Sequence, residues 1–487
     1  MRQEAPYIHK KLVLDVGTNL LIAFHMHNTY KWILILLLLC GSLAGCHKEL
    51  VDASNDIQLD SPPAPTDKLV IYAGPYMLDF MQQAKALYVN KFPDVELEFR
   101  EFGEDSVQIR PGFYVTTPDT QENYEFTLTT ELTAGRGPDL IVFEDEFDLY
   151  KVMQAGTFYN LDNFFAADAS FDQQAYNQEV FNCGYLRGER LFVPLDYQIY
   201  FLLTSREALT DAGLPVVQRP TLDELRALLE QYIKTCDSAR LKLFEIGASP
   251  LNWIAGCGLR LVDYSTKQVF TDTDAFRSMM EYCKILYPYR FQTDENERYI
   301  RALGDNAKAI RDRKLLFSSA YSNGFFYDYR GLKESDTPIY FPAPNVEGDK
   351  PVAMLGFKAA IRANSENQAN AYEFLKILLS MQVQSIDTGF LSIPVLKEAL
   401  EKNLLSRDAF VSFRAGDEAD DVMIEALEQE EIDAFNALVS DVACPGYYSM
   451  ELKHIFIQAM EPYFTDQKTY EACVEQLNQQ LEIYLYE

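Results

Sequence analysis

The sequence predicts an α/β protein built on a parallel sheet, and three observations support this fold class. The chain of 487 residues is long enough for two domains or for one large two-lobed unit. An apolar run at 69–73, an amphipathic segment at 76–92 and an alternating segment at 95–102 give the order strand, helix, strand. A short apolar run at 140–143 then follows a predicted helix at 124–134. Because strands that alternate with helices pair in parallel, we expect these runs to form one sheet.

An apolar segment ahead of the fold predicts export. Residues 32–45 are apolar or small, a run shorter than the ~20 residues of a bilayer span. Lys31 supplies the positive flank of a secretory signal. The run ends in Leu43-Ala44-Gly45-Cys46, which resembles the bacterial lipobox and implies lipidation of a mature N-terminus at Cys46. Acidic residues further upstream make Met26 the expected start, and an uncleaved membrane helix is the alternative.

The charge balance excludes some partners. The chain has 73 Asp and Glu against 43 Lys and Arg, which gives a net charge of −30. Such a surface repels phosphate backbones and anionic head groups, so we expect no binding to nucleic acid and no docking on the membrane face. Hydrophobic residues at 48% and aromatic residues at 13% suffice for a large core and for the lining of a pocket.

Histidine and cysteine usage argues against most enzyme classes. After the signal only His47 and His454 remain, and no nucleophile or ligand motif surrounds His454. Six further cysteines form no CxxC pair and no metal-type spacing, so we expect mostly buried thiols, and the sequence leaves open whether one or two disulfides form. We therefore expect neither a metal nor a cofactor. The six cysteines are Cys183, Cys236, Cys257, Cys283, Cys444 and Cys473.

Local signals define further elements. Residues 111–123 are expected to be irregular, and 188–194 predicts a hairpin-like turn into a strand. Thr221 and Glu224 form a capping box ahead of an amphipathic helix, and a second amphipathic helix is predicted at 371–381.

Five segments carry a resemblance to a known family. They are LVIYAG; TAGRGPDLIVFED followed by QAGTFYNLDNF; RGERLFVPLDYQIYFLLTSREALTDAGL with RPTLDEL; KLLFSSAYSNGFF; and MLGFKAAIRANSENQANAYEFLKILLS ahead of LSIPVLKEAL. Together they cover most of 68–400, and their order is similar to that of the extracellular solute-binding proteins of the maltose-binding type, the family-1 receptors of ABC importers. The chain departs from the family at 103–123, which look inserted, and at Thr204-Ser205, which replace the usual asparagine.

The resemblance implies a two-lobed periplasmic-binding-protein-like fold of type II, with the ligand cleft between the lobes. It also implies a monomer that closes around a small solute by a hinge motion and is then recognised by the membrane subunits of an ABC importer. Carried onto this chain, the division is a signal at 1–45, a lipidated tether at 46–66, lobe 1 at 67–196 plus 352–400, and lobe 2 at 197–351 plus 401–487.

Sugar rings present apolar faces and hydroxyls, so aromatic, carboxylate and amide groups at strand ends are the candidate ligand contacts. In lobe 1, Tyr72 and Tyr76 flank the first strand-to-helix turn, and a core position is the alternative for Tyr72. Asp145 resembles the family's acidic position after the strand at 140–143 and is the leading candidate. Its neighbours Glu144 and Glu146 are alternatives, as is a merely solvated loop.

The crossovers between the lobes supply the next candidates. Asp196, Tyr197 and Gln198 lie at the first crossover, with a solvated hinge as the alternative. Phe357, at the return crossover, is a candidate whose role we expect to be mainly structural.

In lobe 2, Trp253 resembles the start of the helix that carries an aromatic platform in sugar-binding relatives, although a lone tryptophan also suits a core. Tyr321 and Asn323 resemble a further aromatic ligand loop.

These features predict a lipid-anchored extracytoplasmic receptor, not an enzyme, that delivers a small solute to an ABC importer. A sugar or oligosaccharide is the family's commonest cargo, while relatives also carry polyamines, phosphate esters and metals. Two alternatives remain open. One is an exported glycoside hydrolase with two carboxylates, which needs no histidine, and the other is a receptor that signals to a membrane sensor.

Overall fold

The computed structural model describes residues 66–73, 78–101, 107–110, 113–115, 118–143, 149–235, 243–246, 249–289, 306–333, 335–386, 392–405, 410–413, 420–423, 427–444 and 449–486. These residues belong to one compact unit. The expected signal, Cys46 and the tether up to residue 65 lie outside the described residues, and so do Tyr76 and Asp145.

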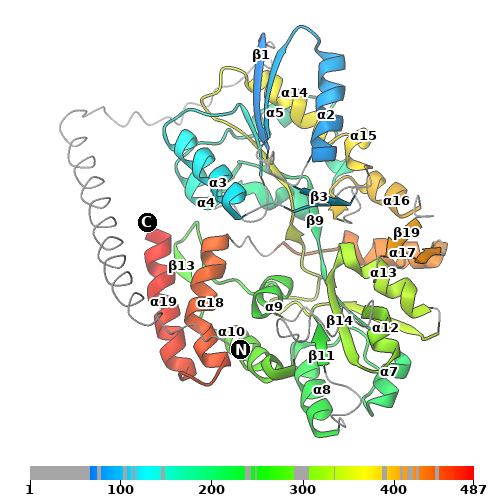
Figure 1. Ribbon diagram of the computed structural model, residues 1–487. Helices are drawn as coiled ribbons and strands as arrows, with labels where there is room; N and C mark the ends of the chain where they lie inside the picture. The colour runs from blue at the N-terminus through cyan, green and yellow to red at the C-terminus, as the bar shows by residue number, and fades with distance from the viewer. Residues whose placement is uncertain are drawn as a thin grey trace, which may run out of the picture. The chain divides into compact units, whose positions relative to one another are not determined.

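The first sheet has five strands in the order β2-β1-β5-β17-β8. β1 pairs in parallel with β2 and β5, whereas β17 runs antiparallel to β5 and β8. The predicted strand, helix, strand opening is therefore confirmed. Figure 1 shows α2 (Leu78–Lys91) and α14 (Gln368–Leu378) near β1, and these two helices pack on each other. The strands are β1 (Lys68–Ala73), β2 (Glu96–Glu101), β5 (Leu140–Phe143), β8 (Val193–Pro194) and β17 (Lys358–Ile361).

The second sheet has four strands in the order β11-β14-β10-β15. β10 runs antiparallel to β14 and β15, and β11 runs parallel to β14. The helices α7, α12 and α13 contact this sheet, as Figure 1 shows. The elements are β10 (Tyr200–Ser205), β11 (Leu243–Ile246), β14 (Leu315–Tyr321), β15 (Pro338–Pro342), α7 (Arg206–Asp211), α12 (Asn306–Arg311) and α13 (Ser322–Lys333).

The segments that connect these two sheets take part in a third, short sheet. It has the order β16-β9-β18, with β9 (Asp196–Gln198) paired antiparallel to β16 (Met354–Leu355) and to β18 (Ile393–Pro394). Only Leu195 separates β8 from β9, and only Ile199 separates β9 from β10. The chain thus passes from the first sheet to the second through β9 and returns through β16.

The remaining elements of the described residues are helices and pairs of short strands. The helices are α3 (Pro118–Thr133), α4 (Leu149–Gln154), α5 (Asp162–Ala167), η1 (Gln173–Ala175), α6 (Gln178–Phe181), η2 (Asn182–Gly184), α8 (Leu222–Thr235), α9 (Pro250–Gly256), α10 (Asp274–Leu286), η3 (Tyr287–Tyr289), α15 (Met381–Gln384), α16 (Lys397–Leu405), α17 (Gln429–Ser440), α18 (Met450–Phe464) and α19 (Tyr470–Tyr486). The paired short strands are β3 (Val107–Arg110) with β4 (Phe113–Val115), β6 (Tyr185–Leu186) with β7 (Glu189–Arg190), β12 (Val262–Asp263) with β13 (Gln268–Val269), and β19 (Phe410–Phe413) with β20 (Asp420–Met423).

Local chemistry explains how several of these elements begin. The capping box before α8 is confirmed, because Glu224 N donates to Thr221 Oγ1 at 3.2 Å and Thr221 N donates to Glu224 Oε2 at 2.8 Å. The predicted hairpin turn is also confirmed, since β6 and β7 pair across Arg187 and Gly188, which have φ of 54° and 86°. Positive φ at both central residues is typical of the tight turns that join two strands.

The prediction of an irregular stretch at 111–123 is wrong in part. β4 lies within that range and pairs with β3, and α3 begins at Pro118, earlier than the predicted 124. Proline suits the first turn of a helix, because the N–H that it lacks would have no helical partner there.

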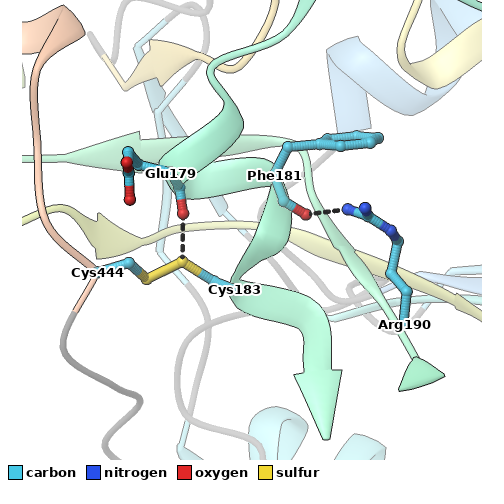
Figure 2. Close-up of a disulfide and its surroundings, with 5 residues drawn as sticks. All are labelled: Glu179, Phe181, Cys183, Arg190 and Cys444. Carbon is cyan, nitrogen blue, oxygen red and sulfur yellow. Dashed lines mark hydrogen bonds between the residues drawn. A yellow bond between two sulfur atoms is a disulfide. The ribbon is translucent and has the colours of Figure 1, made fainter. Parts of the chain in front are cut away.

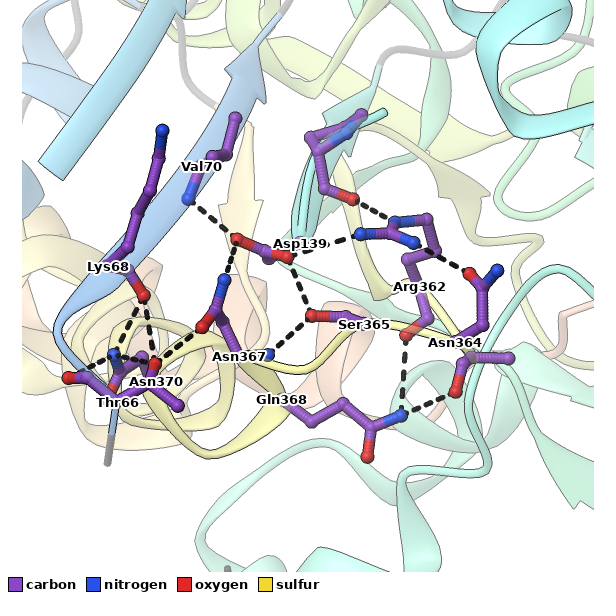
Figure 3. Close-up of polar contacts among 12 residues, drawn as sticks. Thr66, Lys68, Val70, Asp139, Arg362, Asn364, Ser365, Asn367, Gln368 and Asn370 are labelled. Atoms are coloured by element: carbon purple, nitrogen blue, oxygen red, sulfur yellow. Dashed lines mark hydrogen bonds and ion pairs between the residues drawn. The ribbon is translucent and has the colours of Figure 1, made fainter. Parts of the chain in front are cut away.

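A buried carboxylate ties the first sheet to α14 (Figure 3). Asp139, just before β5, accepts hydrogen bonds from Val70 N at 2.8 Å and from Asn367 Nδ2 at 3.0 Å through Oδ2. Its Oδ1 accepts from Ser365 Oγ at 2.6 Å and lies 3.4 Å from Arg362 Nη2. Asp139 is only 2% exposed, so four donors from two segments of chain satisfy one buried charge.

A disulfide joins two segments that are far apart in the sequence (Figure 2). Cys183, in η2, is bonded to Cys444, four residues beyond the end of α17. The neighbouring buried Arg190 donates to Phe181 O at 2.5 Å and fixes the chain beside Cys183. The structure thus answers a question that the sequence leaves open, while Cys236 lies outside the described residues.

Candidate functional site

The carboxyl ends of β1 and β5 define one edge of the first sheet. These strands run parallel, with Ala73 paired to Val142, so both end at this edge. β17 runs the other way and begins at the same edge, where Lys358 pairs with Phe143 and with Pro194. In open α/β sheets, ligands bind outside the carboxyl ends of the strands.

The second sheet has an equivalent edge. β14 ends at Tyr321, which pairs with Tyr200 at the start of β10, and β15 ends at Pro342, which pairs with Phe201. β11 ends here as well, because Ile246 is paired to Ser318. Helix α9 follows β11, so its first residues belong to the same end of this sheet.

The same two connecting segments join these edges. β9 leaves Pro194 of the first sheet and reaches Tyr200 of the second, and β16 leads into β17 at Lys358. Both edges are therefore connected in the chain to the same two crossover strands, β9 and β16, which are hydrogen-bonded to each other. This arrangement suits a ligand site formed by residues from both sheets and from the crossovers.

Asp196 fastens the two crossovers together. Its Oδ1 accepts a hydrogen bond from Phe357 N at 2.6 Å, and its carbonyl oxygen accepts from Gly356 N at 3.1 Å. A Cβ at Gly356 would collide with the Asp196 carboxylate, so glycine is required for this close approach. The structural role expected for Phe357 extends to Asp196, and both residues lie at the predicted crossovers.

Tyr197 and Gln198 point to opposite faces of β9, because side chains alternate along a strand. Tyr197 is buried, donates from Oη to Val439 O at 2.8 Å and accepts from Asn177 Nδ2 at 3.2 Å. Its hydroxyl is therefore occupied by the protein. Gln198 is half-buried and lies on the same side of β9 as Asp196, where it remains a candidate contact.

Tyr72 lies near the carboxyl end of β1 and is 7% exposed. Arg100 donates from Nη1 to its hydroxyl at 3.3 Å, and the guanidinium carbon lies 5.2 Å from the centre of its ring. Burial raises the pKa of Tyr72, so the phenol stays neutral at physiological pH. The alternative of a core position for Tyr72 fits these contacts best.

Trp253 presents no surface to a ligand in this structure. Its side chain, in α9, is 0% exposed and packs edge-on against Tyr200 and Tyr282, with ring centres 6.0 Å and 4.8 Å away. Because a sugar platform needs an accessible ring face, we leave Trp253 out of the site proposed below. The helix position is as predicted, and the ring faces the core.

Tyr321 is half-buried at the end of β14 and donates from Oη to Asn252 Oδ1 at 3.0 Å. This contact joins β14 to the first turn of α9, directly beside Trp253. Asn323 is the second residue of α13, and its side chain lies outside the described part of the chain.

Three residues at these edges were not predicted. Asn252 directly precedes Trp253 and belongs to no recognisable sequence motif. Lys358 is fully buried and donates from Nζ to Gly356 O at 2.6 Å; its signal was a lysine inside the apolar run that begins β17. Glu245 is fully buried in β11, where a carboxyl in a short, otherwise apolar strand was the signal.

The described residues contain no group of three or more histidine, cysteine or acidic side chains arranged to hold a metal. Within the same residues, no helix has the length and apolar character needed to cross a membrane.

Sheet order, antiparallel return strand and paired crossovers together define a two-lobed α/β binding fold of type II. The model of the bacterial extracellular solute-binding protein family matches residues 74–385, which is more than half of the chain. The chain therefore belongs to the bacterial extracellular solute-binding protein family. This family consists of binding proteins rather than enzymes, so the hydrolase alternative is rejected.

Solved structures with the same fold share little sequence with this chain. The sugar-binding protein MalE from Xanthomonas citri aligns with a TM-score of 0.60 and 14% identity over 86% of this chain and 97% of its own. An ABC substrate-binding protein from Listeria monocytogenes in complex with cycloalternan aligns with a TM-score of 0.56 and 11% identity over 86% of this chain and 99% of its own. The acarbose-binding GacH receptor of Streptomyces glaucescens aligns with a TM-score of 0.54 and 15% identity over 86% of this chain and 98% of its own. No protein of curated function matches the chain.

Proposed function

We propose that this protein is a lipid-anchored extracytoplasmic receptor that captures a sugar or oligosaccharide by hinge closure and delivers it to an ABC importer. The observation that carries the proposal is the placement of both sheets' strand ends beside the same two crossover strands. Such a site can contact a ligand from both lobes, and only differential contact of this kind lets a ligand favour the closed form. The two lobes are those predicted above, 67–196 plus 352–400 and 197–351 plus 401–487.

Carbohydrate is the favoured cargo for two reasons. Tyr321, Asn252 and Gln198 provide a partly exposed aromatic ring and amide groups at or next to the strand ends, the chemistry that sugar hydroxyls and ring faces require. The GacH receptor binds acarbose and the Listeria protein binds cycloalternan, both carbohydrates, on the same fold. Asp145 and Tyr76 follow the strand ends of the first sheet and complete the proposed site.

A thermal-shift screen tests the cargo. A ligand that binds only the folded protein at a hundredfold excess over its Kd stabilises it by roughly 2.7 kcal/mol. We expect at least one sugar or oligosaccharide to raise Tm in a saturable manner. A polyamine or phosphate ester that raises Tm where every carbohydrate fails would reject the proposed cargo.

The site itself is tested by two alanine substitutions. Tyr321→Ala and Asn252→Ala should each weaken binding of the carbohydrate by about tenfold or more. A tenfold increase in Kd corresponds roughly to the loss of one hydrogen bond between neutral groups together with the packing around it. Isothermal titration calorimetry measures the change in Kd. Tyr486→Ala is the matched control, because Tyr486 is 72% exposed near the end of α19. Equal affinity of all three variants would place the ligand elsewhere.

The proposed anchor depends on Cys46. Cys46→Ala removes the thiol that would carry the acyl chains, so the variant should leave the membrane fraction and incorporate no labelled fatty acid. Detergent phase partitioning of wild type and variant measures this directly. Cys40→Ala, in the same apolar segment, is the control that should remain anchored.

A further inference from the structure

A carboxyl group with no role so far lies in the core beneath the second-sheet edge of the proposed site. Glu245, in β11, is 0% exposed, and Tyr200 Oη donates to its Oε1 at 3.2 Å. Ser319 of β14 and the indole of Trp253 also interact with this carboxyl. Neither Glu245 Oε2 nor Trp253 Nε1 has full hydrogen-bond geometry with a partner in the described chain, so the carboxylate form would be poorly compensated.

The groups that face Glu245 are polar but uncharged. Tyr200 comes from β10, Cys257 follows α9, and Tyr282 lies on α10, where Cys283 in turn interacts with Tyr282 and Cys257. The contacts that the structure describes for Glu245 include no lysine or arginine. Burial raises the pKa of Glu245 to about 8, and burial also holds the pKa values of Tyr200, Tyr282 and Cys257 well above their ordinary values. Glu245 is therefore the group of this cluster that changes charge near neutral pH.

The cluster continues directly into the proposed site. The ring of Tyr200 lies 5.6 Å from that of Tyr321, its partner in the sheet register, and Tyr321 donates to Asn252. Helix α9 packs tightly on Tyr200, because a Cβ at Gly256 would lie 2.7 Å from the Tyr200 Cβ. Tyr200 therefore connects the buried carboxyl to Tyr321 and to the helix that carries Asn252.

We propose that Glu245 is a positioning residue: through Tyr200 and Trp253 its neutral carboxyl holds the Tyr321–Asn252 pair in place, so ligand affinity is coupled to the protonation of Glu245. This inference rests on the proposed function, because it assigns Tyr321 and Asn252 to the ligand site. Ionisation strengthens the attraction of the carboxyl oxygens for the Tyr200 hydroxyl and the indole N–H, and the shift of these two donors toward Glu245 moves α9 relative to β14. Affinity should therefore fall as pH rises through the pKa of Glu245.

The effect on stability has a defined sign. Below the ordinary glutamate pKa of 4.5, the carboxyl is protonated in both folded and unfolded chains. Between 4.5 and about 8 the folded chain keeps a proton that the unfolded chain has released, so the free energy of unfolding falls as pH rises across this window. Above this window the group has no further effect. Glu245→Gln, which is always neutral, should have a higher Tm than wild type at pH 8 and lose that advantage near pH 4.5.

A fluorescence titration tests the coupling without any ligand. The chain has two tryptophans, so full-length protein with Trp32→Phe reports on Trp253 alone. We expect its emission to change with a midpoint near pH 8, and we expect Glu245→Gln to abolish the change while circular dichroism stays that of the folded protein. A transition that persists in Glu245→Gln, or that is missing from the parent, overturns the inference.

A second substitution separates coupling from simple burial. Because protonation and the Tyr321–Asn252 contact stabilise each other, Tyr321→Phe should lower the midpoint by about half a pH unit, the equivalent of a weak net hydrogen bond. Tyr340→Phe is the control, since Tyr340 lies on β15 of the same sheet and contacts Phe201 and Tyr329 instead. Equal midpoints for the two variants reject the coupling.

This result is independent of the carbohydrate screen. A failed screen with a lowered Tyr321→Phe midpoint would reject the proposed cargo and leave the coupling supported. A successful screen with an unshifted midpoint would reject the coupling alone. Where a carbohydrate does bind, reciprocity requires that its presence raise the midpoint of the titration.

Discussion

Asp139→Ala should lower the free energy of unfolding by about 3–5 kcal/mol, the loss typical of breaking a buried ionic network. The substitution removes one acceptor group but leaves its donors in place. Val70 N, Asn367 Nδ2 and Ser365 Oγ would lose the partners they have at 2.6–3.0 Å, and Arg362 would lose its nearby carboxylate. Urea unfolding followed by circular dichroism measures the change.

The matched control is Glu366→Ala. Glu366 is an exposed acidic residue between Ser365 and Asn367, so it tests removal of a carboxylate from the same turn outside the network. We expect it to change stability by less than about 0.5 kcal/mol. If Asp139→Ala were equally mild, the network would contribute little, and the positions of β1, β5 and α14 would have to depend on apolar packing alone.

Removal of the disulfide should have the second largest effect. Cys183→Ser together with Cys444→Ser opens a covalent loop with a sequence separation of 261 residues. A cross-link that closes a long loop stabilises a protein chiefly by restricting its unfolded chain, and we expect the double variant to lose about 2–5 kcal/mol. Denaturant unfolding of the oxidised wild type and of the double variant gives this difference.

Reductant supplies the control for this experiment. Wild type treated with dithiothreitol should unfold like the double variant, and the double variant itself should not respond. The remaining free cysteines of the described chain, Cys257, Cys283 and Cys473, are buried and form no disulfide there. Equal stability of wild type with and without reductant would show that the bond does not form in solution.

Periodicity predicted much of the first sheet. The runs at 69–73 and 140–143 became β1 and β5 because short apolar runs suit strands covered on both faces. The capping box predicted the start of α8, because its hydrogen bonds join residues only three positions apart. The antiparallel insertion of β17 between β5 and β8 could not be predicted from periodicity, because sheet order depends on contacts between residues more than 160 positions apart.

The sequence predicted which elements carry the candidate residues better than it predicted which side chains are accessible to a ligand. Asp196, Tyr197 and Gln198 do lie on a crossover strand, but sequence cannot tell which side of a three-residue strand faces the protein. Trp253 shows the same limit, since its helix is at the predicted place while its ring packs against Tyr282. Glu245 was missed because its environment comes from four other elements, and composition gives no sign of that burial.

The bond between Cys183 and Cys444 also changes what a protease can do to this protein. It makes a closed ring of the backbone, and the ring contains both crossover strands and every strand of the second sheet. Cutting a ring once yields a single open piece, so one cleavage anywhere from 184 to 443 would leave the two fragments covalently attached. A single nick in a surface loop between Cys183 and Cys444 therefore leaves every strand of the second sheet covalently linked to the rest of the chain.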